Sequence, residues 1–143
     1  MQTYHVQVQR LNAQHVQTTT RGFTLTLGAK RGDAEAGVNP METLLSSMGA
    51  CQLTALATVA DLSRGSIADI GIVLVGVRQD QPPRLSSVSY RLWGQTPVPE
   101  ERLQRLVHMA ERNSTVYQTV AAAIPVSGRT ISGGFSSRTA DEG

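Results

Sequence analysis

The stretch that decides the fold runs from residue 37 to residue 51 and reads GVNPMETLLSSMGAC. Asn39 has the side chain of a helix N-cap, and Pro40 suits the first helical position because its missing N–H would have no helical partner there. Glu42 stands three residues after the cap, where its carboxylate can accept a hydrogen bond from the backbone N–H of Asn39. The stretch therefore predicts a helix that begins at Asn39–Pro40 and carries Cys51, the only cysteine of the chain.

The apolar pattern extends this helix to about Leu62. Apolar residues recur at spacings of three and four along it: Leu44, Met48, Cys51, Ala55, Val59 and Leu62. Leu45, Leu53 and Leu56 widen the apolar sector beyond one narrow stripe. The pattern predicts a long helix that is buried on more than one side.

Alternating apolar and polar residues before this helix predict strands. Tyr4, Val6 and Val8 alternate with polar residues, and a second alternation covers residues 23–27. Residues 12–14 (Asn-Ala-Gln) suit a turn, so we expect a hairpin here. Residues 28–37 lack any periodicity and predict an exposed loop.

Strands and helices also alternate after the long helix, which we expect to end at residues 63–65. Residues 70–77 are apolar on both faces and predict a strand in the centre of a sheet. Gln81-Pro82-Pro83 turns the chain into a second strand over residues 88–92, which completes a β-hairpin. A final strand is predicted over residues 131–135, and the tail after Ser136 should be frayed.

Two further helices are predicted between these strands. The first begins at Pro99 and has the amphipathic spacing of a helix that covers a sheet, with apolar residues at Leu103, Leu106, Val107 and Ala110. Residues 113–115 (Asn-Ser-Thr) interrupt the helical pattern, and Ser114 suits the N-cap of a short helix that ends before Pro125.

Composition narrows the class of protein. A chain of 143 residues is one domain by default and can bury a stable core without a metal or a disulfide. Its 13 basic and 11 acidic residues are mixed along the chain, so nucleic acid is not an expected partner despite a calculated pI near 9.1. The single cysteine and the absence of a leader-like start favour the cytoplasm, and we expect no membrane span.

The stretch 37–51 closely resembles the motif of the OsmC/Ohr family, in which Asn-Pro opens a long central helix that bears the reactive cysteine. The spacing from Pro40 to Cys51 matches, residues 21–25 resemble the strand before the family's loop, and residues 67–94 resemble its central hairpin. The resemblance implies an α+β, OsmC-like fold over residues 1–143. In that fold antiparallel sheets surround the long central helix, and two chains form an intertwined homodimer with sites at the subunit interface.

The resemblance also implies a site. Catalytic members reduce hydroperoxides with two cysteines, an arginine and a glutamate, and the matching residues here are Cys51, Arg21 and Glu42. The second cysteine corresponds to Ser114, which cannot form a disulfide with an oxidised Cys51. Attack on a peroxide requires a thiolate, and burial alone would raise the pKa of Cys51, so a nearby cation is needed. Arg21 is the first candidate, and Arg10 and Arg31 are alternatives.

Glu42 and Ser114 also have structural interpretations. Successive helical residues turn by about 100°, so nine residues place Glu42 and Cys51 on opposite sides of the helix, about 13 Å apart along its axis. Glu42 cannot serve Cys51 of its own chain directly, and its capping role is favoured over orienting an arginine across a dimer interface. Ser114 is likewise favoured as an N-cap over a catalytic group.

Two functional classes follow from this reading. The first is a single-cysteine peroxidase of the oxidative stress response, in which Cys51 attacks a hydroperoxide and an external thiol reduces the product. The second is a non-catalytic OsmC-like protein that binds a small apolar or thiol ligand at the dimer interface. The retained Cys51 favours the first class, and the missing second cysteine favours the second. No cofactor or metal is expected for either class.

Overall fold

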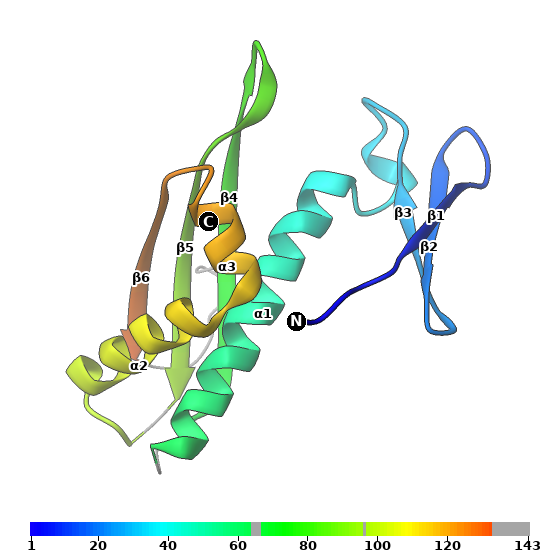
Figure 1. Ribbon diagram of the computed structural model, residues 1–143. Coiled ribbons are helices and arrows are strands. Elements are labelled where there is room, and N and C mark those ends of the chain that lie inside the picture. Colours follow the sequence, from blue (N-terminus) through cyan, green and yellow to red (C-terminus); the bar gives the residue numbers. More distant parts are fainter. Residues whose placement is uncertain (64–66, 96, 133–143) are drawn as a thin grey trace. The chain divides into compact units, whose positions relative to one another are not determined.

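The computed structural model describes residues 1–63, 67–95 and 97–132. The chain forms two compact units, residues 1–44 and residues 45–143. Each unit has its own three-stranded sheet. Most of the long helix over residues 40–62 and the whole of the helix over residues 100–113 belong to the second unit (Figure 1). The α+β class is therefore confirmed, whereas one OsmC-like domain over residues 1–143 stays a prediction.

The first unit is a meander of three antiparallel strands followed by a 3₁₀ turn, η1 (Ala34–Ala36). The strands are β1 (Gln7–Arg10), β2 (His15–Thr20) and β3 (Phe23–Gly28). The predicted turn over residues 12–14 joins β1 to β2, and the Asn12 side chain accepts hydrogen bonds from the N–H groups of Gln14 and His15. The expected two-stranded hairpin was wrong, because β2 contains a single strongly apolar residue and shows no alternation of apolar residues.

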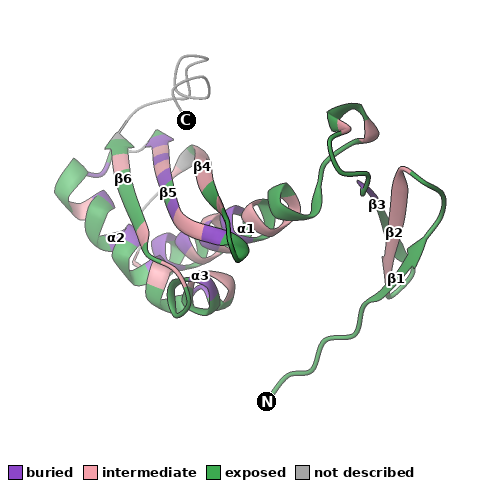
Figure 2. Ribbon diagram, turned by 90° about the horizontal axis from the view of Figure 1, so that it is seen from above, coloured by how far each residue is buried: buried purple, intermediate pink, exposed green. Residues whose placement is uncertain are grey.

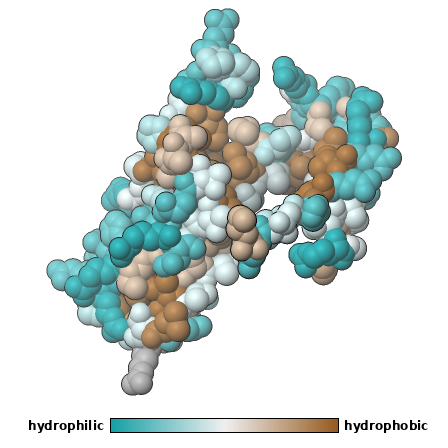
Figure 3. All heavy atoms as spheres, viewed as in Figure 1, coloured by the Kyte–Doolittle hydropathy of each residue, from teal (hydrophilic) through white to brown (hydrophobic). Residues whose placement is uncertain are grey.

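The two faces of this first sheet differ sharply in polarity. The strand register places Val8, Thr18 and Leu25 side by side on one face, together with Val16 and Leu27. The other face carries glutamine and threonine side chains at positions 7, 9, 17, 19, 24 and 26. On the apolar face Val8, Phe23 and Leu25 stay 60%, 67% and 53% exposed. Hydrophobic atoms accordingly reach the surface of this unit (Figure 3).

The long helix α1 (Pro40–Leu62) begins with the predicted capping box. The Asn39 N–H donates to Glu42 Oε1 over 3.0 Å, and the Glu42 N–H donates to Asn39 Oδ1 over 2.8 Å. One face of α1 is buried, at Met48, Gly49, Gln52, Leu56, Val59 and Ala60. Ala50, Thr54 and Thr58 are exposed, so the expected burial on several sides is not reached among the described residues of this chain.

The second sheet contains β4 (Ala68–Asp80), β5 (Pro83–Gln95) and β6 (Val126–Ser132), in that order. β4 and β5 form the predicted antiparallel hairpin, whereas β5 and β6 run parallel. This sheet is therefore mixed and not wholly antiparallel as expected. β4 lies at an edge of it and not in the centre, because the order of strands depends on long-range pairing. The predicted final strand coincides with β6 only at residues 131–132, and its remainder lies outside the described residues.

Helices α2 (Glu100–Asn113) and α3 (Thr115–Ala121) follow β5. The four apolar residues predicted to face the sheet from α2 are all buried. Three of them belong to a core that also includes residues of α1 and β5, and its buried members are Leu56, Val59, Tyr90, Leu92, Leu106, Val107 and Ala110. Buried residues gather on these three elements of the second unit (Figure 2). Helix α1 ends at Leu62, as predicted, whereas residues 64–65 of the expected stop and the tail after Ser136 lie outside the described residues.

Helix α1 meets the length and composition of a membrane span, with a mean hydropathy of 1.3 over its most apolar window, although no such span is expected from the sequence. A third of that window is buried inside the protein. Leu56 and Val59 belong to the core of the second unit, as expected for the core helix of a globular fold.

Candidate functional site

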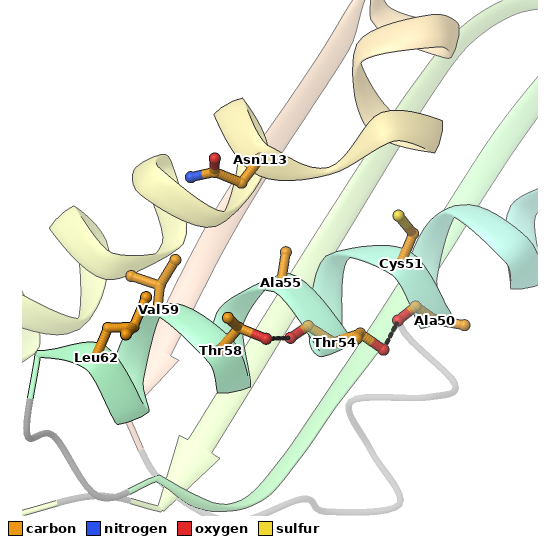
Figure 4. A pocket seen from close by; sticks show the side chains of 8 residues that line it. All are labelled: Ala50, Cys51, Thr54, Ala55, Thr58, Val59, Leu62 and Asn113. Carbon is orange, nitrogen blue, oxygen red and sulfur yellow. Dashed lines mark hydrogen bonds between the residues drawn. The ribbon is translucent and has the colours of Figure 1, made fainter. Parts of the chain in front are cut away.

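Cys51 lies on α1, on the side that faces the start of α3. Its side chain is partly buried, and its Sγ points from α1 toward the segment that joins α2 to α3 (Figure 4). A single residue, Ser114, separates those two helices and lies completely buried. The site is therefore built where one long helix meets the junction of two shorter ones.

Ser114 ends one helix and begins the next. Its backbone is extended, its N–H donates to the carbonyl oxygen of Glu111 over 3.2 Å, and its Oγ accepts a hydrogen bond from the N–H of Tyr117 over 3.3 Å. The predicted N-cap is thereby confirmed. Because extended backbone at an N-cap leaves the next N–H groups without helical partners, those of Thr115 and Val116 are free to donate elsewhere.

Three donors converge on the Cys51 thiol. Burial raises the pKa of Cys51, but hydrogen bonds from the Ser114 hydroxyl and from the N–H groups of Val116 and Thr115 outweigh that effect. The net result is a pKa below the ordinary value of 9.0. Hydrogen bonds to the charged form favour the thiolate in the same way as a neighbouring cation would. The thiolate is thus stabilised here by dipoles contributed by α3.

The Ser114 hydroxyl has only one proton to give. Because its oxygen already accepts a hydrogen bond from the Tyr117 N–H, the hydroxyl proton is available for Cys51 Sγ. Ser114 is therefore both the expected cap and a donor to the thiol, which sequence reasoning did not predict.

A cavity of about 550 Å³ runs along α1 beside the thiol. It is lined by Ala50, Cys51, Thr54, Ala55, Thr58, Val59, Leu62 and Asn113 (Figure 4). The hydroxyls of Thr54 and Thr58 donate to the carbonyl oxygens of Ala50 and Thr54, so both are satisfied within the helix. The α1 wall of the cavity is consequently mostly apolar, and the Asn113 amide adds a polar group at the end of α2.

The other predicted site residues lie in the first unit. Arg21 occupies the turn between β2 and β3 with a φ of 51°, and its guanidinium lies 5.5 Å from the centre of the Phe23 ring. Arg10 ends β1, and Arg31 follows β3. The contact of any of these arginines with Cys51 stays a prediction. Glu42 makes the two capping hydrogen bonds at the start of α1, as favoured from the sequence.

The sequence did not predict that the N–H groups of Thr115 and Val116 donate to Cys51. The interruption at residues 113–115 indicated a helix N-terminus, but not that this terminus meets Cys51. Among the described residues, no group of three or more His, Cys, Asp or Glu side chains could hold a metal ion.

Residues 32–128, which include the whole of α1 and the α2–α3 junction, match the family model described as OsmC-like protein. The chain belongs to the OsmC-like family. No curated protein matches this OsmC-like chain.

Solved structures share the fold at low sequence identity. An OsmC-like protein from Mycoplasma pneumoniae is 16% identical, with a TM-score of 0.85 over 92% of this chain and 97% of that one. An organic hydroperoxide resistance protein OsmC from Legionella pneumophila is 18% identical, with a TM-score of 0.70 over 91% and 97%. The organic hydroperoxide resistance protein OhrB of Bacillus subtilis is 20% identical, with a TM-score of 0.66 over 90% and 98%. These OsmC-like structures support the fold.

Proposed function

We propose that this OsmC-like protein reduces hydroperoxides with Cys51 as its single reactive cysteine. The observation that carries the proposal is the convergence of three hydrogen-bond donors on Sγ, which stabilises the thiolate form needed for nucleophilic attack. Two solved relatives of the same fold are named organic hydroperoxide resistance proteins.

The reaction needs the chain, the peroxide, water and an external thiol. The Cys51 thiolate attacks one peroxide oxygen, the O–O bond breaks, and the alkoxide takes a proton from water to leave as an alcohol. Cys51 is then a sulfenic acid. A small thiol condenses with it to give a mixed disulfide and water, and a second thiol releases Cys51 as a small-molecule disulfide forms. The Ser114 hydroxyl stands beside Sγ and cannot replace that external thiol.

Arg21 is the proposed cation of the site, with Arg10 and Arg31 as alternatives. An arginine facing the thiol would stabilise the charge that develops on the peroxide oxygens as the O–O bond breaks. Glu42 is proposed to orient that arginine from its place at the start of α1. Variants that remove these groups should lower peroxide turnover while leaving the fold intact.

We propose that the protein is a homodimer. The apolar face of the first sheet leaves Val8, Phe23 and Leu25 exposed, and one side of α1 presents Ala50 and Thr54. An exposed apolar sheet face is typical of a surface that binds a partner. In a two-fold homodimer the same apolar surface of each chain is buried at the interface. Light scattering at micromolar concentration should give twice the mass of the chain, and a folded monomer would contradict the dimer. The cytoplasm is the proposed compartment, where the single thiol would stay reduced.

The second candidate function is binding of a small apolar or thiol ligand without turnover. The mostly apolar cavity beside Cys51 and the serine in place of a second cysteine favour it. Such a ligand would occupy the cavity and leave the thiol chemically unchanged, or held as a mixed disulfide.

One experiment separates the two candidates. The protein is treated with cumene hydroperoxide in the presence of dimedone, and intact mass is measured. A peroxidase should give one dimedone adduct on Cys51 and should consume peroxide beyond one equivalent only when a small thiol is added. Cys51→Ser should abolish both results. Wild-type protein that forms no adduct and consumes no peroxide with any thiol tested would refute the peroxidase and favour the ligand-binding function.

A further inference from the structure

A second cluster of titratable groups lies behind the thiol site, around the carboxylate of Glu111. The Glu111 side chain is only 15% exposed, although it belongs to the last turn of α2. The hydroxyls of Tyr90 on β5 and Tyr117 on α3 both donate to its carboxylate. His108 Nδ1, on the solvent side, lies 3.4 Å from Oε2. One partly buried carboxylate thus joins α2 to both β5 and α3.

The main chain of Glu111 also binds residues at the α2–α3 junction. Its carbonyl oxygen accepts hydrogen bonds from the N–H of Ser114 over 3.2 Å and from Nε2 of Gln118 over 3.0 Å. Tyr117, which donates to the carboxylate through its hydroxyl, donates to Ser114 Oγ through its N–H. Glu111 is therefore linked to Ser114 by two routes, one through the main chain and one through Tyr117.

We propose that Glu111 is a positioning residue for Cys51, because its carboxylate holds α2, α3 and β5 in the arrangement that directs the donors of residues 114–116 at Sγ. This inference rests on the proposed function in that it concerns the reactivity of the same thiol. Glu111 does not touch Sγ in this arrangement, and it acts only through Ser114 and the start of α3.

The chemistry of the cluster explains why a carboxylate is suited to this place. A carboxylate offers about four acceptor lone pairs and brings no proton of its own, so it can accept hydrogen bonds from both phenols. Burial, together with the hydrogen bond and the negative charge of Glu111, raises the pKa of Tyr90, and the same causes raise the pKa of Tyr117. Both phenols therefore remain protonated donors at neutral and moderately alkaline pH. A glutamine at this position would offer one uncharged acceptor oxygen, so its hydrogen bonds to the two phenols would be weaker.

The Tyr90 ring also depends on the strand beside it. A Cβ atom built on Gly128 of β6 would lie 2.0 Å from the ring of Tyr90, so the ring occupies the space above this glycine. The parallel pairing of β5 and β6 places the two residues opposite one another. Gly128 thereby leaves room for Tyr90 to reach Glu111.

The test compares native-state alkylation of Cys51 by iodoacetamide, measured from pH 6 to pH 10, in the wild type and four variants of the full chain: Glu111→Gln, Tyr117→Phe, Glu101→Gln and Ser114→Ala. Glu111→Gln and Tyr117→Phe should each shift the rate–pH curve toward higher pH and slow alkylation at pH 7 about two- to threefold, since a displaced donor weakens a charge-assisted hydrogen bond. Glu101→Gln, on the exposed first turn of the same helix, is the matched control and should keep the wild-type curve. Urea unfolding measures the stability of each variant separately.

Tyr117→Phe keeps the backbone N–H that caps α3, so it answers the question even if Glu111→Gln does not fold. Wild-type rate–pH curves in Tyr117→Phe and in any folded Glu111→Gln protein, alongside a slowed Ser114→Ala, would overturn the positioning role. Loss of stability alone, without a shift of the curve, would overturn it as well. A wild-type protein that alkylates as expected but consumes no peroxide would remove the proposed function and leave this inference standing.

Discussion

Replacing Ser114 with alanine removes two interactions at once, and their effects are measured separately. The first is the N-cap of α3, where the hydroxyl oxygen accepts the Tyr117 N–H. Loss of an N-cap lowers the free energy of unfolding by about 1 kcal/mol. The second is the hydrogen bond from the hydroxyl to Cys51 Sγ. The backbone donors of Thr115 and Val116 remain in the variant.

The effect on the thiol can be worked out from these contacts. A hydrogen bond to a charged group is worth about 1.5–3 kcal/mol, and the partial exposure of Cys51 favours the lower end. A loss of ~1.5 kcal/mol lowers the ratio of thiolate to thiol about tenfold. The remaining thiolate is more basic and therefore more nucleophilic. With a Brønsted slope of about 0.4–0.5, each thiolate reacts roughly threefold faster, which offsets part of the tenfold loss. Alkylation of native protein near pH 7 should therefore slow about three- to fourfold.

The assay is the rate of iodoacetamide alkylation as a function of pH, with urea unfolding on the same samples. Wild-type Cys51 should reach half of its limiting rate below pH 9.0, because its pKa is lowered, and the Ser114→Ala curve should lie at higher pH. Thr119→Ala is the control, since that hydroxyl belongs to α3 but donates to the Thr115 carbonyl. Superimposable curves for wild type and Ser114→Ala would refute the donor role of Ser114 and leave only the cap.

Three further changes test other parts of the structure. Glu42→Gln should keep the capping hydrogen bond and hence the stability but lower peroxide turnover, and unchanged turnover would leave Glu42 with a capping role alone. Ser114→Cys should form a disulfide with Cys51 on oxidation, seen as a mass loss and a loss of free thiol, because the two side chains are already in contact. Leu103→Ala should lower the free energy of unfolding by about 2–5 kcal/mol in urea, since Leu103 is completely buried, and a change under 1 kcal/mol would contradict the packing described for α2.

The sequence predicted the features that depend on nearby residues. The capping box of α1, the buried face of α2 and the cap at Ser114 each follow from side chains within a few positions of one another, and all three are confirmed. Strand order does not follow from local pattern. The apolar residues of β4 predicted a central strand, but β4 lies at an edge of its sheet. A strand that is apolar on both faces can occupy an edge, because burial depends on what packs against the strand and not on the strand alone.

In the candidate site, too, the local features were predicted and the contacts between distant residues were not. Cys51 and Ser114 were both singled out from the sequence, Cys51 by its place on the helix and Ser114 by its place between two helices. Their contact, and the donation from Thr115 and Val116, depend on how α3 packs against α1. The reasoning from charge sought an arginine, whereas the donors that the structure places at Sγ are a hydroxyl and two peptide groups. Peptide dipoles have no signature in composition, which is why they were missed.

Gly128 has a consequence for how this protein tolerates mutation. It carries no functional group and belongs to an edge strand, so a survey of polar side chains would ignore it. Even an alanine there would have to displace the Tyr90 ring, and with it the hydroxyl that donates to Glu111. A random screen for protein that folds but whose Cys51 is alkylated about two- to threefold more slowly should therefore recover substitutions at this glycine.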